Sequence, residues 1–446
     1  MPYTSSKYSP RTQRFMSAKL SKVLIGPQVP PEYGAAIDAN CTHIETIELL
    51  KKMMEKYDVE PPTEIKFTRI SHFQECMSKC GYLISSGAAV SVCFVCGDGF
   101  DTHQEIETFF DTQNIRTLDD VEFRDVMVHG DGVADITIEL VPLSVQNLEL
   151  VLVNVNSVLL TNTLDLKRLH YVANGGVDSN PEVFCNLLPN SIADLRLDLS
   201  RCEMDQIFVE FPIAVQSLVF KLNTLVCLKD FDIGYLSQLA HLTLEGVDIG
   251  SIATLRIPES LTRLFWYDCS MDTFTDFQQL KHIEELSIRE VYLDGRFLSW
   301  LAKLPNLREL QYKEPRNAPK HTFKPTPPIN VRAPPKLEFL EIQSKHVRLT
   351  HLYFHTTLKF LVLKDVTIEP TQLSLRDAPN LVEVLIDNTN IKKIYGFENC
   401  PHLKLLKFNG TPIYRCREIQ CVEFSRKNYP RVVNNGLGPV VGSSTR

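Results

Sequence analysis

The sequence predicts an α/β solenoid, a stack of short repeats that each add one strand to a parallel sheet on the concave side. The pattern apolar-x-x-Leu-x-apolar recurs twelve times, and successive repeats begin 21 to 30 residues apart. The repeats begin at Val145, Leu166, Ile192, Val215, Leu239, Leu261, Ile283, Leu307, Leu337, Leu358, Leu381 and Leu403. The fourth position is leucine in all of them but one, which has Val384. Units this short cannot bury a core alone, so they must stack on their neighbours.

The repeat resembles the leucine-rich repeat, whose period is about 20 to 29 residues. Residues 189–195 and 258–264 are similar to the Pro-x-Ser-Leu-x-x-Leu repeats of fungal and slime-mould proteins. Residues 381–413 resemble the class of about 22 residues per repeat found in a regulatory subunit of protein phosphatase. The resemblance implies the fold and a role in binding rather than in chemistry, and it does not name a partner.

The N-terminal region precedes the clear repeats. Residues 1–31 contain five basic residues and no acid, which predicts a disordered basic tail. A mitochondrial-type targeting segment and a basic docking tail are alternatives for the same residues. Thr42 and Glu45 have the spacing of a capping box, followed by apolar residues at helical spacing, so we expect a helix that covers the first repeat.

These patterns divide the whole chain into six parts. We expect a disordered basic tail over 1–31, a helical N-terminal cap over 32–64 and degenerate repeats with a possible cysteine cluster over 65–140. The clear repeats follow over 141–413, then a C-terminal cap over 414–432 and a disordered tail over 433–446.

One repeat is longer than the rest, since thirty residues separate Leu307 from Leu337. The segment 313–335 contains seven prolines and five basic residues. This composition favours an extended loop that leaves the stack. The loop is either an inert insertion or a basic docking loop.

Strand geometry predicts the binding surface. Positions one, four and six of each repeat point inward, so positions three, five and seven face outward along the concave sheet. Most outward residues are charged or polar, but several are aromatic or arginine, the composition of an interaction hot spot. The predicted partner-binding residues are Arg263, Phe265, Tyr267, Arg289, Phe339, Phe360 and Val362.

Two cysteine pairs form the one metal-like pattern. Cys76 and Cys80 are followed, after twelve residues, by Cys93 and Cys96, and a glycine follows the second cysteine of each pair. This approaches zinc-ribbon spacing. Buried or partly exposed free thiols are the alternative, because cysteine is common as a small buried hydrophobe. The sequence otherwise predicts no cofactor and no catalytic residues.

We therefore expect a non-enzymatic intracellular scaffold that binds a protein partner on its concave face. The alternative is a substrate-recognition subunit of a ubiquitin ligase, with an adaptor bound at residues 32–130, although these residues contain no recognisable F-box. A net charge of -7 makes nucleic acid an unlikely partner. The chain starts without an export signal, contains no confident membrane span and has scattered cysteines, which together favour the cytosol or nucleus.

Overall fold

In the computed structural model, the chain folds into two compact units. Unit 1 comprises residues 1–204 and 208–223, and unit 2 comprises residues 205–207 and 224–446. The structure describes residues 8–28, 41–85, 87–133, 135–155, 159–160, 163–175, 181–203, 206–207, 209–228, 232–248, 256–269, 280–291, 295–315, 328–412 and 431–434.

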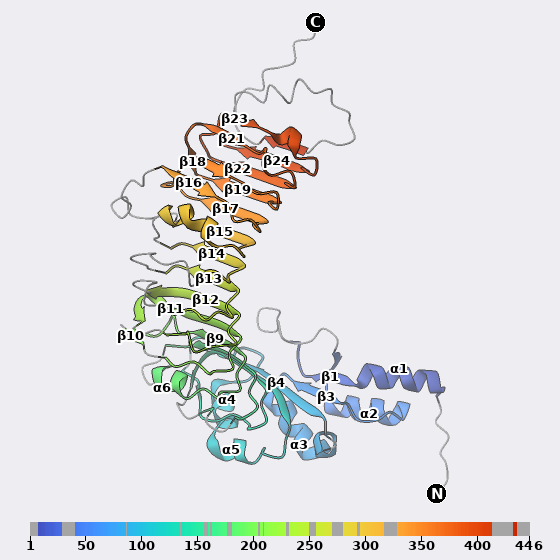
Figure 1. Cartoon of the computed structure of the whole chain (residues 1–446). Coiled ribbons are helices and arrows are strands. Elements are labelled where there is room, and N and C mark those ends of the chain that lie inside the picture. The colour runs from blue at the N-terminus through green and yellow to red at the C-terminus, as the bar shows by residue number, and fades with distance from the viewer. Residues whose placement is uncertain are drawn as a thin grey trace. The chain divides into compact units, whose positions relative to one another are not determined.

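A parallel sheet runs through unit 1 (Figure 1). Each strand pairs with the next in the order β2 (Thr42–Ile44), β1 (Lys22–Ile25), β3 (Glu64–Phe67), β4 (Ala89–Val95), β5 (Phe123–His129), β7 (Asn147–Val155), β8 (Arg168–Ala173), β9 (Asp194–Asp198) and the first part of β11 (Ser217–Leu228). The short strand β6 (Thr137–Ile138) pairs with the end of β7.

The helices of unit 1 precede its first strand or connect consecutive strands. They are α1 (Pro10–Leu20), α2 (Ile47–Tyr57), α3 (Ile70–Ser85), α4 (His103–Phe109), α5 (Thr112–Arg116) and α6 (Pro181–Asn186). Phe73 of α3 contacts Phe67 of β3 with ring centroids 5.5 Å apart, and Phe109 of α4 contacts Phe94 of β4 at 5.1 Å. The core of this region therefore lies between these helices and one face of the sheet.

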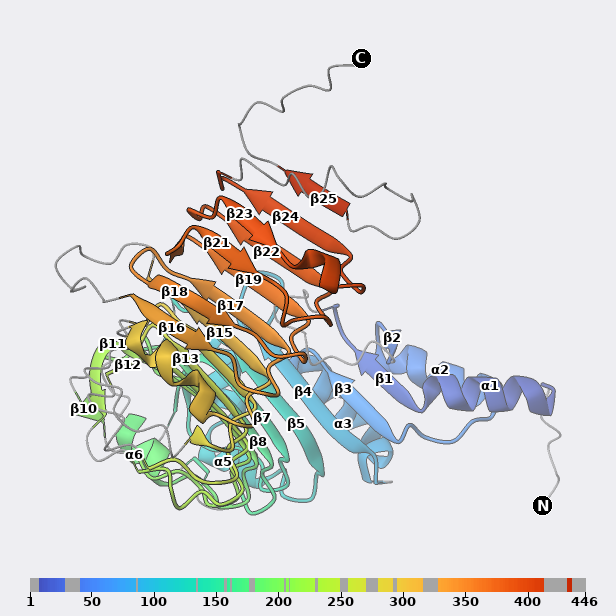
Figure 2. The same ribbon diagram turned by 45° about the horizontal axis from the view of Figure 1, so that its top comes forward.

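The main strands of unit 2 are parallel as well (Figure 2). Its strands pair in the order β12 (His241–Asp248), β13 (Arg263–Tyr267), β14 (Glu285–Arg289), β15 (Glu309–Lys313), β17 (Phe339–Gln343), β19 (Phe360–Lys364), β22 (Glu383–Asp387), β24 (Leu405–Asn409) and β25 (Arg431–Asn434). The strand β10 (Gln206–Ile207) pairs with the last two residues of β11.

The returning segments of unit 2 contain short strands and 3₁₀ helices. The strands β16 (Ile329–Arg332), β18 (Arg348–Tyr353) and β20 (Thr367–Ile368) form one small parallel sheet, and β21 (Gln372–Ser374) and β23 (Lys393–Tyr395) form another. The 3₁₀ helices are η2 (Gly295–Lys303) and η3 (Phe397–Asn399).

The predicted repeat column is confirmed. All twelve residues that begin the repeats are at most 5% exposed, and the residues at the fourth position are at most 2% exposed. Consecutive repeats place one strand each into a parallel ladder, residue opposite residue, as in β13 and β14, where Leu264 pairs with Leu286. The fold is a leucine-rich-repeat solenoid, with one strand of each repeat in the large sheet and the returning chain on its other side.

Proline occupies the turn that precedes the strand in eight of the twelve clear repeats. The N–H of Ile192 donates to the carbonyl of Pro189, and that of Leu261 donates to the carbonyl of Pro258 at 3.1 Å. In other repeats the proline is the second residue of the turn instead of the first. In one of these, the N–H of Leu307 donates to the carbonyl of Leu304, and Pro305 follows Leu304. Proline suits the first two positions of such a turn because its φ is fixed and it has no N–H to satisfy.

A residue with a left-handed backbone follows several strands of unit 2. Asp268, Glu290, Asp365 and Asn388 have φ between 48° and 59°. Each donates its N–H to the carbonyl at the end of the next strand; Glu290, for example, donates to Lys313 at 2.8 Å. Asn and Asp tolerate this conformation better than most residues, which explains three of the four side chains found there.

The N-terminal prediction was wrong at two points. Residues 10–25, predicted as a disordered tail, form α1 and β1. The side chain of Ser9 caps α1, and Met16 and Leu20 are buried, so packing outweighs the polar composition. The capping residue of the next helix is Thr46, whereas Thr42 lies in β2.

Other boundaries also differ from the sequence prediction. Within the predicted Pro-rich loop 313–335, Lys313 belongs to β15 and residues 329–332 form β16; residues 316–327 lie outside the described residues. Most of the predicted C-terminal cap and most of the last predicted tail also lie outside them. The strand β25 spans the boundary between the two, so Val433 and Asn434, predicted as disordered, are in a strand. The degenerate repeats over 65–140 do add strands β3 to β5 to the sheet in parallel.

Candidate partner-binding surfaces

The predicted outward residues lie on one face of the unit 2 sheet, which we call its open face. In β13 the burial alternates, with Leu264 and Trp266 fully buried and Phe265 and Tyr267 half-buried. Phe339 in β17 and Phe360 and Val362 in β19 are also half-buried. Together with Arg263 and Arg289, these five residues form the aromatic patch.

The strand order divides the aromatic patch into two groups. Phe265 and Tyr267 stack with ring centroids 6.2 Å apart, and Phe339 and Phe360 are 6.2 Å apart on neighbouring strands. Between the groups lie β14 and β15, so three strand spacings, about 14 Å, separate β13 from β17. The intervening open-face residues are polar, including Ser287 in register with Phe265.

The two arginines of the aromatic patch are held by intramolecular contacts. The Nε atom of Arg263 lies 3.3 Å from Oε1 of Glu285. The guanidinium of Arg289 lies 5.4 Å from the centroid of the Tyr267 ring and donates a hydrogen bond to Gln311. These contacts orient the arginines beside the aromatic rings of β13.

The four cysteines of the zinc prediction occupy different environments. Cys76 and Cys80 are buried on α3, among the side chains behind the sheet. Cys93 alternates with the core residues of β4, so it lies on the opposite face and packs against Phe100 and Met127. Burial raises the pKa of both the Cys76 and the Cys93 thiol to about 12.

The described residues hold no assembled metal site. Within those ranges, no three histidine, cysteine, aspartate or glutamate side chains are grouped so that they could hold a metal ion. The strand alternation at Cys93 is the physical reason, because it directs that thiol away from α3. Nine cysteines in the same ranges form no disulfide.

A second surface lies on the open face of unit 1. A hollow of about 540 Å³ opens there, which we call the charged hollow. It is lined by Lys66, Arg124, Asp125, Met127, Asn147, Leu148, Glu149, Arg168, Leu169, His170, Asp194 and Arg196. These residues come from strands β3, β5, β7, β8 and β9, so successive strands of the sheet form its floor.

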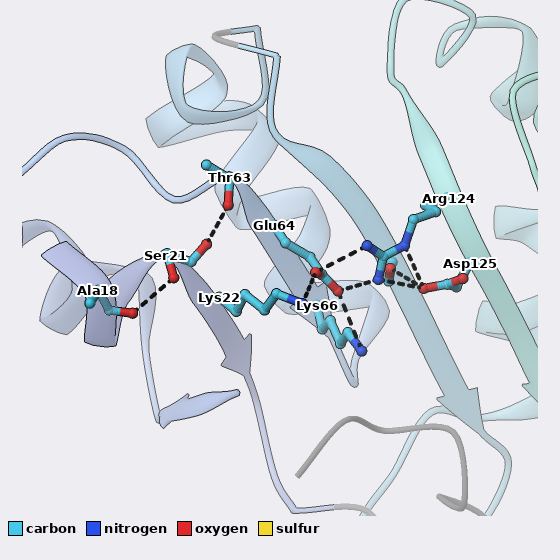
Figure 3. A network of polar contacts seen from close by, with 9 residues as sticks. Ala18, Ser21, Lys22, Thr63, Glu64, Lys66, Arg124 and Asp125 are labelled. Atoms are coloured by element: carbon cyan, nitrogen blue, oxygen red, sulfur yellow. Dashed lines mark hydrogen bonds and ion pairs between the residues drawn. The ribbon is translucent and has the colours of Figure 1, made fainter. Parts of the chain in front are cut away.

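One edge of the charged hollow is an ion-pair network (Figure 3). The guanidinium of Arg124 contacts both carboxylate oxygens of Glu64, with Nη1 3.1 Å from Oε2. Lys22 and Lys66 also lie within 3.4 Å of this carboxylate, whose side chain is only 4% exposed. Burial opposes the charge of Glu64, but the hydrogen bonds and charges of these cations outweigh it and hold its pKa below the usual value.

Asp125 is held by several donors next to this network. Its carboxylate accepts hydrogen bonds from Ser91 at 2.7 Å and from Asn147 at 2.6 Å, and it also accepts from the Arg124 guanidinium. Burial would raise its pKa, but these donors and the charge of Arg124 lower it. Asp125 is therefore ionised at neutral pH.

Glu149 lies in the floor of the charged hollow between two histidines. Its Oε1 atom is 3.2 Å from Nε2 of His129 and 3.8 Å from Nδ1 of His170. Burial opposes ionisation, yet the two imidazoles lower the pKa of Glu149 to about 2. Asp125 and Glu149 are thus both charged and engaged by neighbouring groups.

The sequence analysis did not find the charged hollow. Its outward residues follow the same alternation as those of unit 2, so the pattern of residues 145–170 could have shown Asn147, Glu149, Arg168 and His170. The network around Glu64 had no such signal, because the strands before β7 lack the leucine pattern and Glu64 meets Arg124 only through the strand register.

Comparisons with known proteins give fold-level likenesses. No protein-family model and no curated protein matches the sequence. Among solved structures, an internalin (InlF) of Listeria monocytogenes is similar at 13% identity and a TM-score of 0.41, over 72% of this chain and 86% of that one. The functional domain of InlJ from the same organism gives 15% identity and a TM-score of 0.38, over 70% of each chain. YopM of Yersinia enterocolitica gives 16% identity and a TM-score of 0.31, over 65% of this chain and 78% of that one.

The helices in the described ranges are short. None of them is long and apolar enough to cross a membrane.

Proposed function

We propose that this protein is a non-enzymatic intracellular scaffold that binds a protein partner on the open face of unit 2, at the aromatic patch. The observation that carries the proposal is the half-buried aromatic pair Phe265 and Tyr267. Stacking of the repeats does not require these rings, because Leu264 and Trp266 on the same strand are fully buried and supply the core. Burying this exposed aromatic surface against a partner would contribute favourable binding free energy.

The arrangement of the patch supports a protein partner rather than a small molecule. Its two aromatic groups are about 14 Å apart across the polar strands β14 and β15. A ligand that contacts both groups must therefore be extended or belong to a folded surface. The ordered arginines beside the rings add hydrogen-bond donors, and Arg and Tyr are both enriched in binding hot spots.

The ubiquitin-ligase alternative is less well supported. Strands β2 to β5, within residues 41–133, are built into the unit 1 sheet, and the helices between them pack on that sheet. An adaptor would therefore have to dock on the outer surfaces of these helices. Recovery of a cullin or an adaptor subunit with the full chain would favour this alternative.

Affinity capture with the full chain, read by mass spectrometry, tests the proposal. The baits are the wild type, the double variant Phe265→Ala, Tyr267→Ala, and the control Tyr353→Ala. Tyr353 is 45% exposed on β18, in a separate sheet of the same unit. We expect at least one protein that the wild type and the control retain and the double variant loses. If all three baits retain the same proteins, the aromatic patch is not the binding site.

A further inference from the structure

Three carboxylates line the charged hollow, and two of them are engaged by several groups. The third, Asp194, lies 3.6 Å from Nε of Arg196. Asp125 accepts from Ser91, Asn147 and Arg124, and Glu149 lies between His129 and His170. A carboxylate oxygen has few lone pairs left after several such contacts. The hollow therefore offers little to a cationic ligand.

Two cations of the hollow, Arg168 and Arg196, are engaged far less than these carboxylates. Arg168 is exposed, and in the described part of the chain no carboxylate lies within 4 Å of its guanidinium. The Nε atom of Arg196 lies 3.6 Å from Asp194, and the Arg196 side chain is 55% exposed. Because a guanidinium has five donors in a planar fork, both arginines can still bind an anion at two points.

Lys66 adds a third cation on the opposite side of the hollow. Its side chain is 8% exposed and its ammonium lies 3.4 Å from Glu64. That carboxylate is shared with Lys22 and with Arg124. Arg124 is also paired with Asp125, so two acids serve these three cations and one positive charge is left over at this side of the hollow.

The spacing of these cations indicates the kind of anion. Lys66 is on β3 and Arg196 is on β9, five strand spacings away, or about 24 Å. A single phosphate or carboxylate ion can contact Arg168 and Arg196, which are on neighbouring strands, but it cannot also reach Lys66. An extended peptide of about seven residues spans the distance, at about 3.3 Å per residue.

From these contacts we propose a second binding site: the charged hollow binds an acidic segment of a protein partner, with Asp or Glu carboxylates on Arg168 and Arg196. This site differs from the aromatic patch in both position and chemistry. It does not depend on the aromatic patch being a binding site.

Selection of peptides on the full chain tests the proposal. The probe is a phage-displayed library of random peptides about twelve residues long, selected on the wild type at low salt. We expect the recovered peptides to be enriched in Asp and Glu. Synthetic copies should bind Arg168→Ala, Arg196→Ala at least about tenfold more weakly than the wild type, because each loses a charge-assisted bidentate contact.

Three controls accompany the selection. Arg308→Ala removes an exposed arginine of unit 2 and should leave peptide binding unchanged, as should Phe265→Ala, Tyr267→Ala. The charge-conserving variant Arg168→Lys, Arg196→Lys should bind with intermediate affinity, because lysine cannot form the bidentate contact. The melting temperature of each variant shows whether it is folded.

Each other outcome overturns the proposal. Recovered peptides without acidic enrichment would do so, as would acidic peptides that bind the folded double-alanine variant as tightly as the wild type. Displacement of the peptides by equimolar glutarate or inorganic phosphate would show a site for small anions instead. Loss of binding in the Phe265→Ala, Tyr267→Ala variant alone would place the peptides on the aromatic patch.

Discussion

Glu64 on β3 and Arg124 on β5 form a two-point ion pair across the intervening strand β4. The β4 residue in register with Glu64 is Ala89, whose small side chain leaves room for the guanidinium. Arg124 follows Phe123 at a register shift between β4 and β5. Two residues 60 positions apart are thus joined over two strand spacings, about 10 Å.

The ion pair predicts a specific loss of stability. Arg124→Ala removes two hydrogen bonds from a nearly buried carboxylate and leaves it with Lys22 and Lys66 alone. We expect a loss of about 2 kcal/mol in the free energy of unfolding, less than for a carboxylate left with no partner. Urea unfolding monitored by circular dichroism measures it.

Arg168→Ala is the matched control for this prediction. Arg168 is an exposed arginine on the same sheet face without a carboxylate partner in the described residues. Its removal should change stability by less than about 0.5 kcal/mol. Equal losses in the two variants would show that the Glu64 pair adds nothing to stability.

The buried carboxyl group of Asp101 predicts how the stability of the fold depends on pH. Burial raises the pKa of its carboxyl from 3.8 to about 6, although the N–H of Ile70 donates to it. The folded state therefore holds a proton that the unfolded state releases, so stability is lost as the pH rises from about 4 through 6. Asp101→Asn removes this titration and can still accept the hydrogen bond.

The measurement for Asp101 is the stability difference between the variant and the wild type at several pH values. We expect Asp101→Asn to gain on the order of 2 kcal/mol relative to the wild type between pH 4 and pH 7. A constant difference over that range would contradict a raised pKa.

The alternation of inward and outward residues predicts that substitutions at two adjacent positions change stability by very different amounts. Leu264 is fully buried and Phe265 beside it faces outward. Leu264→Asp places an unpaired charge in the core and should cost several kcal/mol, about 4 or more. Phe265→Ser should cost about 1 kcal/mol or less. Thermal melts that show similar losses would mean that the strand phase is wrong.

The environments of the cysteines predict a labelling order. Cys93 is buried with a pKa of about 12, whereas Cys96 is half-buried at the end of the same strand. Because the thiolate is the reactive form, iodoacetamide at pH 8 should label Cys96 well before Cys93 in the folded protein. Added zinc should not change this order. Protection of both thiols by zinc would support a zinc site at these cysteines.

Much of the fold of the clear repeats was predictable because each repeat is local. The column from Val145 to Leu403 and the outward phase of Phe265 follow from alternation along single strands. The helix at residues 10–20 was not predictable from composition, because the burial of Met16 and Leu20 depends on tertiary packing. The cysteine spacing was misleading for a related reason, since alternation along β4 sends Cys93 to the face opposite Cys76.

The two candidate binding sites also differ in how much of each could be predicted from the sequence. The members of the aromatic patch could be chosen from the repeat phase, but its division into two groups depends on the polar side chains of β14 and β15. The charged hollow requires the register between β3, β4 and β5, in a region where the leucine pattern fades. That register is visible only in three dimensions.

The affinity of the captured partner for the aromatic patch tests the central proposal most directly. Isothermal titration calorimetry gives the Kd of the purified partner for the wild type, for Phe265→Ala, Tyr267→Ala and for the control Tyr353→Ala. We expect at least about thirtyfold weaker binding by the double variant, equivalent to about 2 kcal/mol, with an unchanged melting temperature and an unaffected control. An unchanged Kd in a folded double variant would contradict the account.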